Sequence, residues 1–333
     1  MAASEFLVLN EAEIRECVRM DAESLAAVEA GFTAMARGLA EVPPPMGIAV
    51  PERGGEVHVK SAYIRGLRGF AVKIASGFWR NAERGLPASS GMMVLLDAET
   101  GFPLALLLDN GYLTDVRTAL AGAIAANNLA RKEVRAAGVV GAGVQARMQI
   151  EALQLVRRFE RVLVWGRNAA KVQAYAAEMS AKLGVDVRAA ASVAEVVGES
   201  DLVVTTTPAR EPLVLATHLH AGLHITAMGS DGPGKQELDP QVLARADLLV
   251  CDRRAQCAQL GELQHALGAG ELNAASPVTE LGEITAGSKP GRTSNTQITV
   301  CDLTGVGVQD TAIATLAYDR AVARKLGQPF RSK

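Results

Sequence analysis

An apolar strand, a glycine turn and a helix follow one another near residue 140, and this succession constrains the fold more than any other stretch. Residues 135–147 read Arg-Ala-Ala-Gly-Val-Val-Gly-Ala-Gly-Val-Gln-Ala-Arg and contain the pattern Gly141-x-Gly143-x-x-Ala146. In such a pattern the first glycine permits a tight turn, and the second lets backbone N–H groups approach a pyrophosphate. The small third residue permits close helix–strand packing. The pattern predicts a dinucleotide site at the helix N-terminus, and a purely structural turn is the alternative.

The glycine pattern begins at residue 141 of 333, so the chain is long enough for a separate domain before it. The first 40 residues indicate two helices, and Val42-Pro-Pro-Pro45 should end the second because proline cannot continue a helix. Apolar segments punctuated by glycine then indicate an α+β lobe built mainly from hairpins. The expected helices cover 11–19 and 22–39, and the expected strands cover 56–63, 69–75, 91–97 and 103–109.

Strands and helices alternate from the glycine turn onward, which favours a parallel, doubly wound sheet. The apolar helix 114–129 should lead into this region, and the helix 311–325 should return to the first lobe. We therefore expect an α/β protein in which a Rossmann-type domain (119–305) interrupts a discontinuous α+β domain (1–118 and 306–333). The expected strands of the Rossmann-type domain cover 137–140, 161–165, 185–189, 202–206, 224–228, 248–251 and 299–302.

The composition fits an ordinary globular enzyme, since 49% of the residues are hydrophobic and 21% are charged. A net charge of −2 gives no reason to expect nucleic acid or an anionic membrane as a partner. The sequence has neither a signal-peptide pattern nor an apolar run of transmembrane length, so a cytoplasmic location is expected. The four cysteines lack CxxC spacing and are interpreted as reduced thiols.

The residues after the second expected strand of the Rossmann-type domain bear on which nicotinamide cofactor binds. NAD sites commonly place an acidic residue there to hold the ribose 2′-hydroxyl. This chain has Arg167 and Asn168 instead, with Lys171 shortly after. A guanidinium suits a 2′-phosphate, so NADP(H) is favoured over NAD(H), and a solvated Arg167 with either cofactor is the alternative. Cofactor contacts also collect after a later strand, here at Thr205, Thr206 and Thr207.

Three charged side chains are candidates for chemistry. Lys73 lies in the apolar strand Phe70-Ala-Val-Lys-Ile-Ala75, where a buried ammonium must be paired or used, although strand alternation would also permit a solvent-facing lysine. Arg117 opens an apolar helix and would anchor a carboxylate, or else form a salt bridge with Asp115 or Asp109. Asp231 follows a strand within Met228-Gly-Ser-Asp-Gly-Pro-Gly-Lys235 and would act as an acid or base, or else form the turn.

Two further motifs are not assigned a function. His218, His220 and His224 suggest a metal at first sight, but neither a cysteine nor a carboxylate completes a ligand set at sensible spacing. We therefore expect no metal. The pair Arg253-Arg254 is interpreted as a solvated helix start rather than as an anion site.

At these residues the chain resembles the ornithine cyclodeaminase/mu-crystallin family over nearly its whole length. Several independent motifs in one order are more specific than the glycine turn alone. The segments 107–117, 227–231 and 302–310 look most like the ectoine-utilisation branch, EutC. The matching motifs are Val72-Lys73-Ile74, Thr114-x-x-Arg117-Thr118, Gly141-x-Gly143-x-Gln145, Gly229-x-Asp231-x-Pro233-Gly234-Lys235-x-Glu237-Leu238, Gly291-Arg292-x-Ser294 and Gly305-x-Gly307-x-x-Asp310.

The resemblance implies a homodimer whose N-terminal lobes pair into a shared β-structure, with NAD(P) bound between lobe and nucleotide domain. By motif match, Lys73 and Arg117 would hold a substrate carboxylate, and Asp231 would act as the acid or base at the reacting carbon. The expected cofactor contacts, besides those named above, are Thr118, Gly141, Ala142, Gly143, Val144, Gln145, Met228, Gly229, Ser230, Lys235 and Gly305.

Lys60 marks a departure from the family pattern. By the resemblance, ornithine cyclodeaminases carry an acidic residue at this place, on the strand before the lysine strand. This acid recognises the distal amine of the substrate. This chain has His58-Val-Lys60 there, and the preceding stretch 45–51 lacks the arginine that those enzymes carry. Because like charges repel, Lys60 disfavours a cationic substrate side chain and favours a second anionic or polar group.

The favoured activity is therefore the NAD(P)H-dependent reduction of an α-imino acid, with amino acid dehydrogenation as the reverse reaction. The first alternative is a cyclodeaminase that releases ammonia from ornithine or another diamino acid without net change in its cofactor. The second is a non-catalytic NADPH-binding protein like mu-crystallin. The expected partners are a small amino or imino acid and a second copy of the chain.

Overall fold

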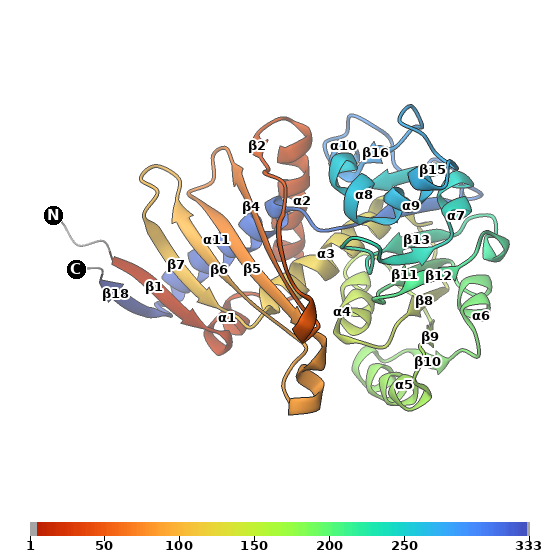
Figure 1. The fold of residues 1–333 in the computed structure, drawn as a ribbon, viewed down its shortest axis with the longest axis horizontal. Helices are drawn as coiled ribbons and strands as arrows, with labels where there is room; N and C mark the ends of the chain where they lie inside the picture. The colour runs from red at the N-terminus through yellow and green to blue at the C-terminus, as the bar shows by residue number, and fades with distance from the viewer. Residues whose placement is uncertain (1–4, 332–333) are drawn as a thin grey trace. The chain divides into compact units, whose positions relative to one another are not determined.

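The structure is a computed structural model that describes residues 5–331 of the chain (Figure 1). It divides into two compact units, which are Met1–Arg117 with Val306–Lys333 and Thr118–Gly305. The division falls inside the helix α3 (Tyr112–Leu129), so one continuous helix contributes residues to both units. In the described part of the chain, helices are too short or too polar to cross a bilayer.

A mostly antiparallel sheet forms the centre of the first unit. Within the described residues its strands follow the order β18-β1-β7-β6-β5-β4-β2, and β3 pairs with β4. The strand bounds are β1 (Glu5–Asn10), β2 (Ala40–Glu41), β3 (Met46–Val50), β4 (Gly55–Ile64), β5 (Gly69–Phe78), β6 (Ser89–Asp97), β7 (Pro103–Leu108) and β18 (Gln328–Arg331), with the short helices η1 (Pro51–Arg53) and η2 (Trp79–Arg84).

The helix α11 (Gly307–Arg324) packs against β4, β5 and α2 (Ala22–Ala36), while α1 (Glu11–Cys17) contacts it as well (Figure 1). Its first half, from Gly307 to Thr315, is buried throughout. A Cβ at Gly307 would overlap the backbone of Ser61 on β4, so only glycine permits the helix to begin this close to the sheet. This close packing carries Asp310 into the interior.

A parallel sheet forms the centre of the second unit. Within the described residues its strands follow the order β10-β9-β8-β11-β13-β17-β15-β16. The strand bounds are β8 (Ala136–Val140), β9 (Arg161–Trp165), β10 (Asp186–Ala189), β11 (Leu202–Thr205), β13 (His224–Ala227), β15 (Leu248–Cys251), β16 (Thr279–Glu280) and β17 (Thr299–Asp302), and a separate small pair joins β12 (Arg210–Val214) to β14 (Gln236–Leu238). The helices are α4 (Val144–Leu153), α5 (Ala169–Leu183), α6 (Val193–Gly198), η3 (Ala216–His218), α7 (Pro240–Ala244), α8 (Arg254–Leu260), α9 (Glu262–Gly268) and α10 (Leu281–Thr285).

Both faces of the parallel sheet are buried, as is usual for such sheets. Successive residues of β9 show this, because Val162 and Val164 belong to one apolar cluster and Leu163 belongs to the other. Val203 on β11 likewise lies in the cluster opposite that of Leu202. The predicted α/β architecture, with a Rossmann-type parallel sheet and a discontinuous second region, is confirmed.

Several strands were not anticipated. The first 40 residues begin with β1 rather than directly with a helix, and β1 pairs with β18 from the other end of the chain. The small β12–β14 pair and β16 were also missed. The helix expected over 22–39 ends at Ala36, ahead of the prolines, because Gly38 adopts the left-handed conformation (φ 68°) that terminates helices.

Candidate functional site

Two lysines lie side by side in the sheet of the first unit. Lys60 on β4 and Lys73 on β5 stand directly opposite each other in the antiparallel ladder. Opposed residues project from the same face of a sheet, so the two ammonium groups share one environment. Only 8% of Lys60 and 2% of Lys73 is exposed to solvent. The alternative in which Lys73 faces solvent is therefore wrong.

A buried carboxylate on α11 meets these cations. Lys73 Nζ lies 3.3 Å from Asp310 Oδ2, and Arg117 Nε on α3 lies 2.9 Å from Asp310 Oδ1. Asp310 is completely buried. Asp109, one of the partners considered for Arg117, instead accepts a 2.7 Å hydrogen bond from the N–H of Leu113 at the start of α3. Arg117 thus pairs with a carboxylate from the far end of the sequence.

Cationic side chains converge in this cluster. Lys73 and Arg117 both pair with the carboxylate of Asp310, and Lys60 stands opposite Lys73 in the ladder. Burial, reinforced by the nearby Arg117 cation, lowers the pKa of Lys73 to about 7, while Asp310 acts in the opposite direction. Among the described residues, Arg117 Nε and both Asp310 oxygens lack a partner in strict hydrogen-bond geometry. Cationic side chains arranged in this way are suited to bind a ligand carboxylate.

In the second unit the glycine turn has the geometry that phosphate binding requires. Gly141 has φ of 122°, where a Cβ would overlap the hydroxyl of Thr206. Gly143 is the N-cap of α4 and gives that helix no side-chain cap. A Cβ at Gly143 would meet open space, so this side of the turn is not covered by neighbouring atoms. Val144 is exposed at the same place. Uncapped N–H groups beside open space fit a pyrophosphate.

Two basic residues follow β9 at the surface of the second unit. Arg167 and Lys171 are exposed, and the structure records neither in an ion pair within residues 5–331. Asn168 has a structural task, since its side chain caps α5 by accepting a 3.0 Å hydrogen bond from the N–H of Lys171. Cations therefore follow β9 at the position where NAD sites often carry an acid.

Glu237 on β14 holds two loops of the second unit together. It accepts hydrogen bonds from the hydroxyl of Thr205 at 2.6 Å, the N–H of Thr207 at 2.5 Å and the N–H of Gly229 at 2.8 Å. Burial raises the pKa of Glu237 to about 7, and the bonds from Thr205 and Thr207 oppose the rise. Thr205 thus directs its hydroxyl to Glu237, and Thr206 directs its own to the carbonyl of Val140 at 3.3 Å.

Asp231 is held by its own loop. Its Oδ1 lies 2.8 Å from Nζ of Lys235, which is largely buried, while the side chain of Asp231 remains 50% exposed. The hydroxyl of Ser230 donates to the carbonyl of Lys235 at 2.6 Å and tightens the same loop. An exposed carboxylate fixed by a buried ammonium is suited to acid–base work.

The remaining predicted contacts are held through the backbone. The N–H of Met228 donates to the carbonyl of Thr205 at 3.0 Å, which joins neighbouring strand ends. The N–H of Gly305 donates to Asp252 at 2.6 Å. The carbonyl of Thr118 accepts from Gln149 at 3.0 Å. Gln145 contacts Gln149 within α4. Ala142, between the two glycines, accepts from the guanidinium of an arginine on α4 through its carbonyl.

The three histidines considered for a metal have hydrogen-bonding roles. The ring of His224 lies between the hydroxyls of Thr299 at 2.9 Å and Thr226 at 3.0 Å. Burial lowers the pKa of His224 to about 3. His220 contacts backbone carbonyls, and His218 accepts from the N–H of Leu215. Arg253 is the residue before α8, in line with the interpretation of a helix start.

The structure assembles the predicted residues into two groups. Lys60, Lys73 and Arg117 form one group in the first unit. In the second unit, two loops meet at Glu237. These are the threonine loop (205–207) and the Gly229–Lys235 loop. Asp310 and Glu237 are the two residues to which sequence reasoning gave no role. The available signal was a carboxylate within an apolar or small-residue run, as in Gly305-Val-Gly-Val-Gln-Asp-Thr-Ala-Ile-Ala314.

Comparison with known proteins decides the family. The sequence pattern of the ornithine cyclodeaminase/mu-crystallin family matches residues 4–325. The chain belongs to this family. A Rhizobium meliloti protein with a provisional assignment as a dehydrogenase is 50% identical over 325 residues, covering 98% of each chain. An uncharacterized cyclodeaminase of Sinorhizobium fredii is 48% identical over 326 residues, again covering 98% of each.

Solved structures of the same fold include two reductases. Thermococcus litoralis Δ1-pyrroline-2-carboxylate reductase, in complex with NADH and L-proline, has a TM-score of 0.92 at 33% identity and covers 97% of this chain and 99% of its own. Paracoccus denitrificans iminosuccinate reductase, in complex with NAD⁺, has a TM-score of 0.90 at 33% identity. The match covers 98% of this chain and 99% of the reductase chain. These relatives are oxidoreductases named for imino acids. The four relatives do not carry an ectoine-utilisation name.

Proposed function

We propose that this protein is an NAD(P)H-dependent reductase of an α-imino acid, running in reverse as an amino acid dehydrogenase. The observation that carries the proposal is the buried cluster in which Lys73 and Arg117 pair with Asp310 and Lys60 lies opposite Lys73. A carboxylate-bearing substrate would be attracted to these cationic groups. The two reductases of similar structure, which act on a cyclic and a dicarboxylic imino acid by name, support this class of reaction.

In this proposal each group of residues has its own task. Lys73 and Arg117 bind the α-carboxylate and orient the imine. Lys60 binds a second anionic or polar group of the side chain. Asp231 delivers the proton that the nitrogen takes up, while the Asp231–Lys235 ion pair holds its position. The nicotinamide cofactor, when bound, supplies the hydride that the α-carbon accepts. Reduction thus consumes one imine, one reduced cofactor and one proton, and yields one amine and one oxidised cofactor.

The proposed division of labour follows the two units. The first unit binds the substrate and forms the homodimer, and the second binds NAD(P). Exposed apolar side chains on β3, Met46 and Ile48, support a partner surface on the first unit. The glycine turn binds the pyrophosphate, and the threonine and Gly229–Lys235 loops bind the nicotinamide half.

NADP(H) is proposed as the preferred cofactor, with Arg167 and Lys171 binding the 2′-phosphate. Both are exposed after β9 and carry the charge that this phosphate requires. The test compares NADPH with NADH in the wild type and in Arg167→Asp. We expect the substitution to shift kcat/KM toward NADH, because a carboxylate repels the phosphate and accepts from the ribose hydroxyls. An unchanged ratio would exclude Arg167 from the phosphate site.

The decisive experiment for the reaction follows the absorbance of reduced nicotinamide with cyclic and dicarboxylic α-imino acids. Ammonia release is assayed in parallel on ornithine and diaminobutyrate with NAD⁺. Consumption of reduced cofactor equal to amine formed is the expected result. Ammonia release at constant cofactor would instead establish a cyclodeaminase, and tight cofactor binding without turnover of either class would establish a mu-crystallin-like binding protein.

The cyclodeaminase remains the second candidate because the family includes such enzymes and a 48% identical relative carries that name. Its substrate would be a diamino acid, and diaminobutyrate suits the proposed likeness to the ectoine-utilisation branch. The charge of Lys60 weighs against it, since a distal ammonium beside this buried lysine would be repelled.

A further inference from the structure

A groove of about 1010 Å³ lies in the second unit, at the edge of the parallel sheet where the strands begin. Arg135 directly precedes β8 and Asp201 directly precedes β11, and both line the groove. The loop 292–295 before β17 and the C-terminal end of α3 complete its walls. The glycine turn follows the other end of β8, which is roughly 15 Å away for a five-residue strand. The groove is therefore separate from the dinucleotide turn.

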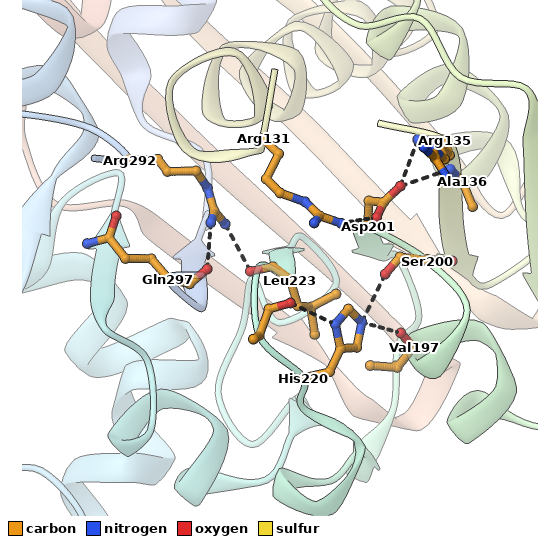
Figure 2. A network of polar contacts seen from close by, with 11 residues as sticks. Arg131, Arg135, Ala136, Val197, Ser200, Asp201, His220, Leu223, Arg292 and Gln297 are labelled. Atoms are coloured by element: carbon orange, nitrogen blue, oxygen red, sulfur yellow. Dashed lines mark hydrogen bonds and ion pairs between the residues drawn. The ribbon is translucent and has the colours of Figure 1, made fainter. Parts of the chain in front are cut away.

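The lining of the groove is strongly cationic. Five of its side chains are basic and two are acidic. Asp201 is already neutralised, because it forms an ion pair with Arg131 and accepts from the N–H groups of Arg135 and Ala136, as Figure 2 shows. Glu133 is the other acid. The basic side chains are Arg131, Lys132, Arg135, Arg157 and Arg292.

Two of the arginines donate their hydrogen bonds to neutral oxygens. Arg292 donates to the carbonyls of Leu129, Leu223 and Gln297, two of which are drawn in Figure 2. Arg157 donates to carbonyls at the end of α3, such as that of Asn127 at 2.7 Å. All of these acceptors are neutral. Burial and the neighbouring Arg131 lower the pKa of Arg292 to about 10. The N–H groups of these guanidiniums are already used in hydrogen bonds, but their positive charges still contribute to the electrostatic potential of the groove.

Other donors remain for a ligand. Arg131 Nε is buried and lacks a hydrogen-bond partner among the described residues. Lys132 and Arg135 are exposed residues that line the groove. Within residues 5–331, neither forms an ion pair. A buried, unpaired guanidinium nitrogen costs free energy unless an acceptor arrives. Two exposed cations, one buried donor and the positive potential of Arg157 and Arg292 together suit a compact ligand with several anionic oxygens.

We propose that this groove is a binding site for a small phosphoryl anion such as pyrophosphate. Arg157 and Arg292 supply the potential, and Arg131, Lys132 and Arg135 contact the phosphoryl oxygens. The groove volume also admits a larger molecule that carries a diphosphate, such as a nucleoside diphosphate. The site is additional to the dinucleotide site and independent of the reaction proposed above.

The experiment is a calorimetric titration of pyrophosphate into the full chain saturated with NADP⁺, which keeps the glycine turn occupied. Ionic strength is held constant with sodium chloride. The test variant is Lys132→Ala/Arg135→Ala. The control is Arg158→Ala/Arg245→Ala, which removes the same charge from exposed positions of the second unit outside the groove. Thermal unfolding of all three proteins verifies that each is folded.

Saturable binding with Kd below about 1 mM, weakened at least about tenfold in the groove variant and unchanged in the control, is the expected result. Absence of saturable binding, or equal weakening in both variants, would overturn the proposal. Parallel titrations with inorganic phosphate, adenosine diphosphate and citrate identify the source of the anion. If inorganic phosphate or adenosine diphosphate binds and its binding is weakened only in the groove variant, the result supports the phosphoryl class. Binding of citrate without binding of any of the phosphoryl anions would contradict it.

Discussion

Lys60 and Lys73 face each other across the β4–β5 ladder, both buried, in the first unit of the protein. Like charges directly opposed in a sheet destabilise the fold unless other charges compensate. Asp310 forms ion pairs with Lys73 and with Arg117, which offsets part of this cost. We propose that the arrangement serves to bind a substrate carboxylate.

Substituting Lys60→Glu should invert the side-chain preference of the enzyme. The carboxylate would repel a second anionic group and attract a distal amine, as in the cyclodeaminase pattern. We expect kcat/KM for a dicarboxylic imino acid to fall by about 10²-fold, with a smaller change for an uncharged imino acid. Steady-state kinetics on both substrates provide the check, with Lys60→Gln as the charge-neutral comparison. Equal losses on both substrates would show that Lys60 has no selective role.

Carboxylate binding should weaken as the pH rises through about 7. The pKa of Lys73 is lowered to about 7, so its ammonium is charged below that pH and progressively neutral above it. Because only the charged form attracts a carboxylate, the inhibition constant of an unreactive carboxylate analogue should rise over this range. Bound carboxylate favours the charged form and moves the midpoint upward in the complex.

The matching variant is Lys73→Arg, in which the side chain stays charged at all these pH values. Its inhibition constant should be flat where that of the wild type rises. Lys182→Arg, an exposed lysine of the second unit paired with Glu151, is the control and should retain the wild-type profile. A flat wild-type profile would mean that Lys73 does not titrate at the binding site.

Replacing Asp231→Asn should lower kcat by about 10²- to 10⁴-fold, because the amide cannot exchange the proton. The dissociation constant of the cofactor, measured by fluorescence titration, should change little. Asp186→Asn provides a control, since Asp186 has a similarly exposed side chain in the same unit and also forms an ion pair. Near-normal turnover of Asp231→Asn would remove this residue from the proton transfer.

Replacing Glu237→Gln tests whether this carboxylate holds the two loops of the second unit together. The carboxylate accepts three hydrogen bonds, and an amide nitrogen at one oxygen position would oppose a donor. We expect a loss of about 1–3 kcal/mol in the free energy of unfolding, measured by denaturant titration. Cofactor affinity should fall as well, because the threonine loop and the loop at Gly229 would lose their common anchor. A variant with wild-type stability and wild-type cofactor affinity would contradict this role of Glu237.

The parallel domain could be derived from sequence because its signals are local. The strand before Gly141, the turn itself and the helix after it are each encoded within a few residues. Lys73 was likewise conspicuous as a charge in an apolar strand. β1 was not foreseen, because it is stabilised by pairing with β18 and β7, which lie far away in the chain.

By itself, then, the sequence determined the alternation of strands and helices, the glycine turn and the choice of Lys60, Lys73, Arg117 and Asp231 as candidates. Only the tertiary structure decided which groups meet. It made Asp310 the partner of Arg117 and Glu237 the anchor of two loops, and it gathered five basic residues from separate segments around one groove. The physical reason is that backbone conformation responds mainly to neighbours along the chain, whereas the energy of a buried charge depends on which distant groups packing brings beside it.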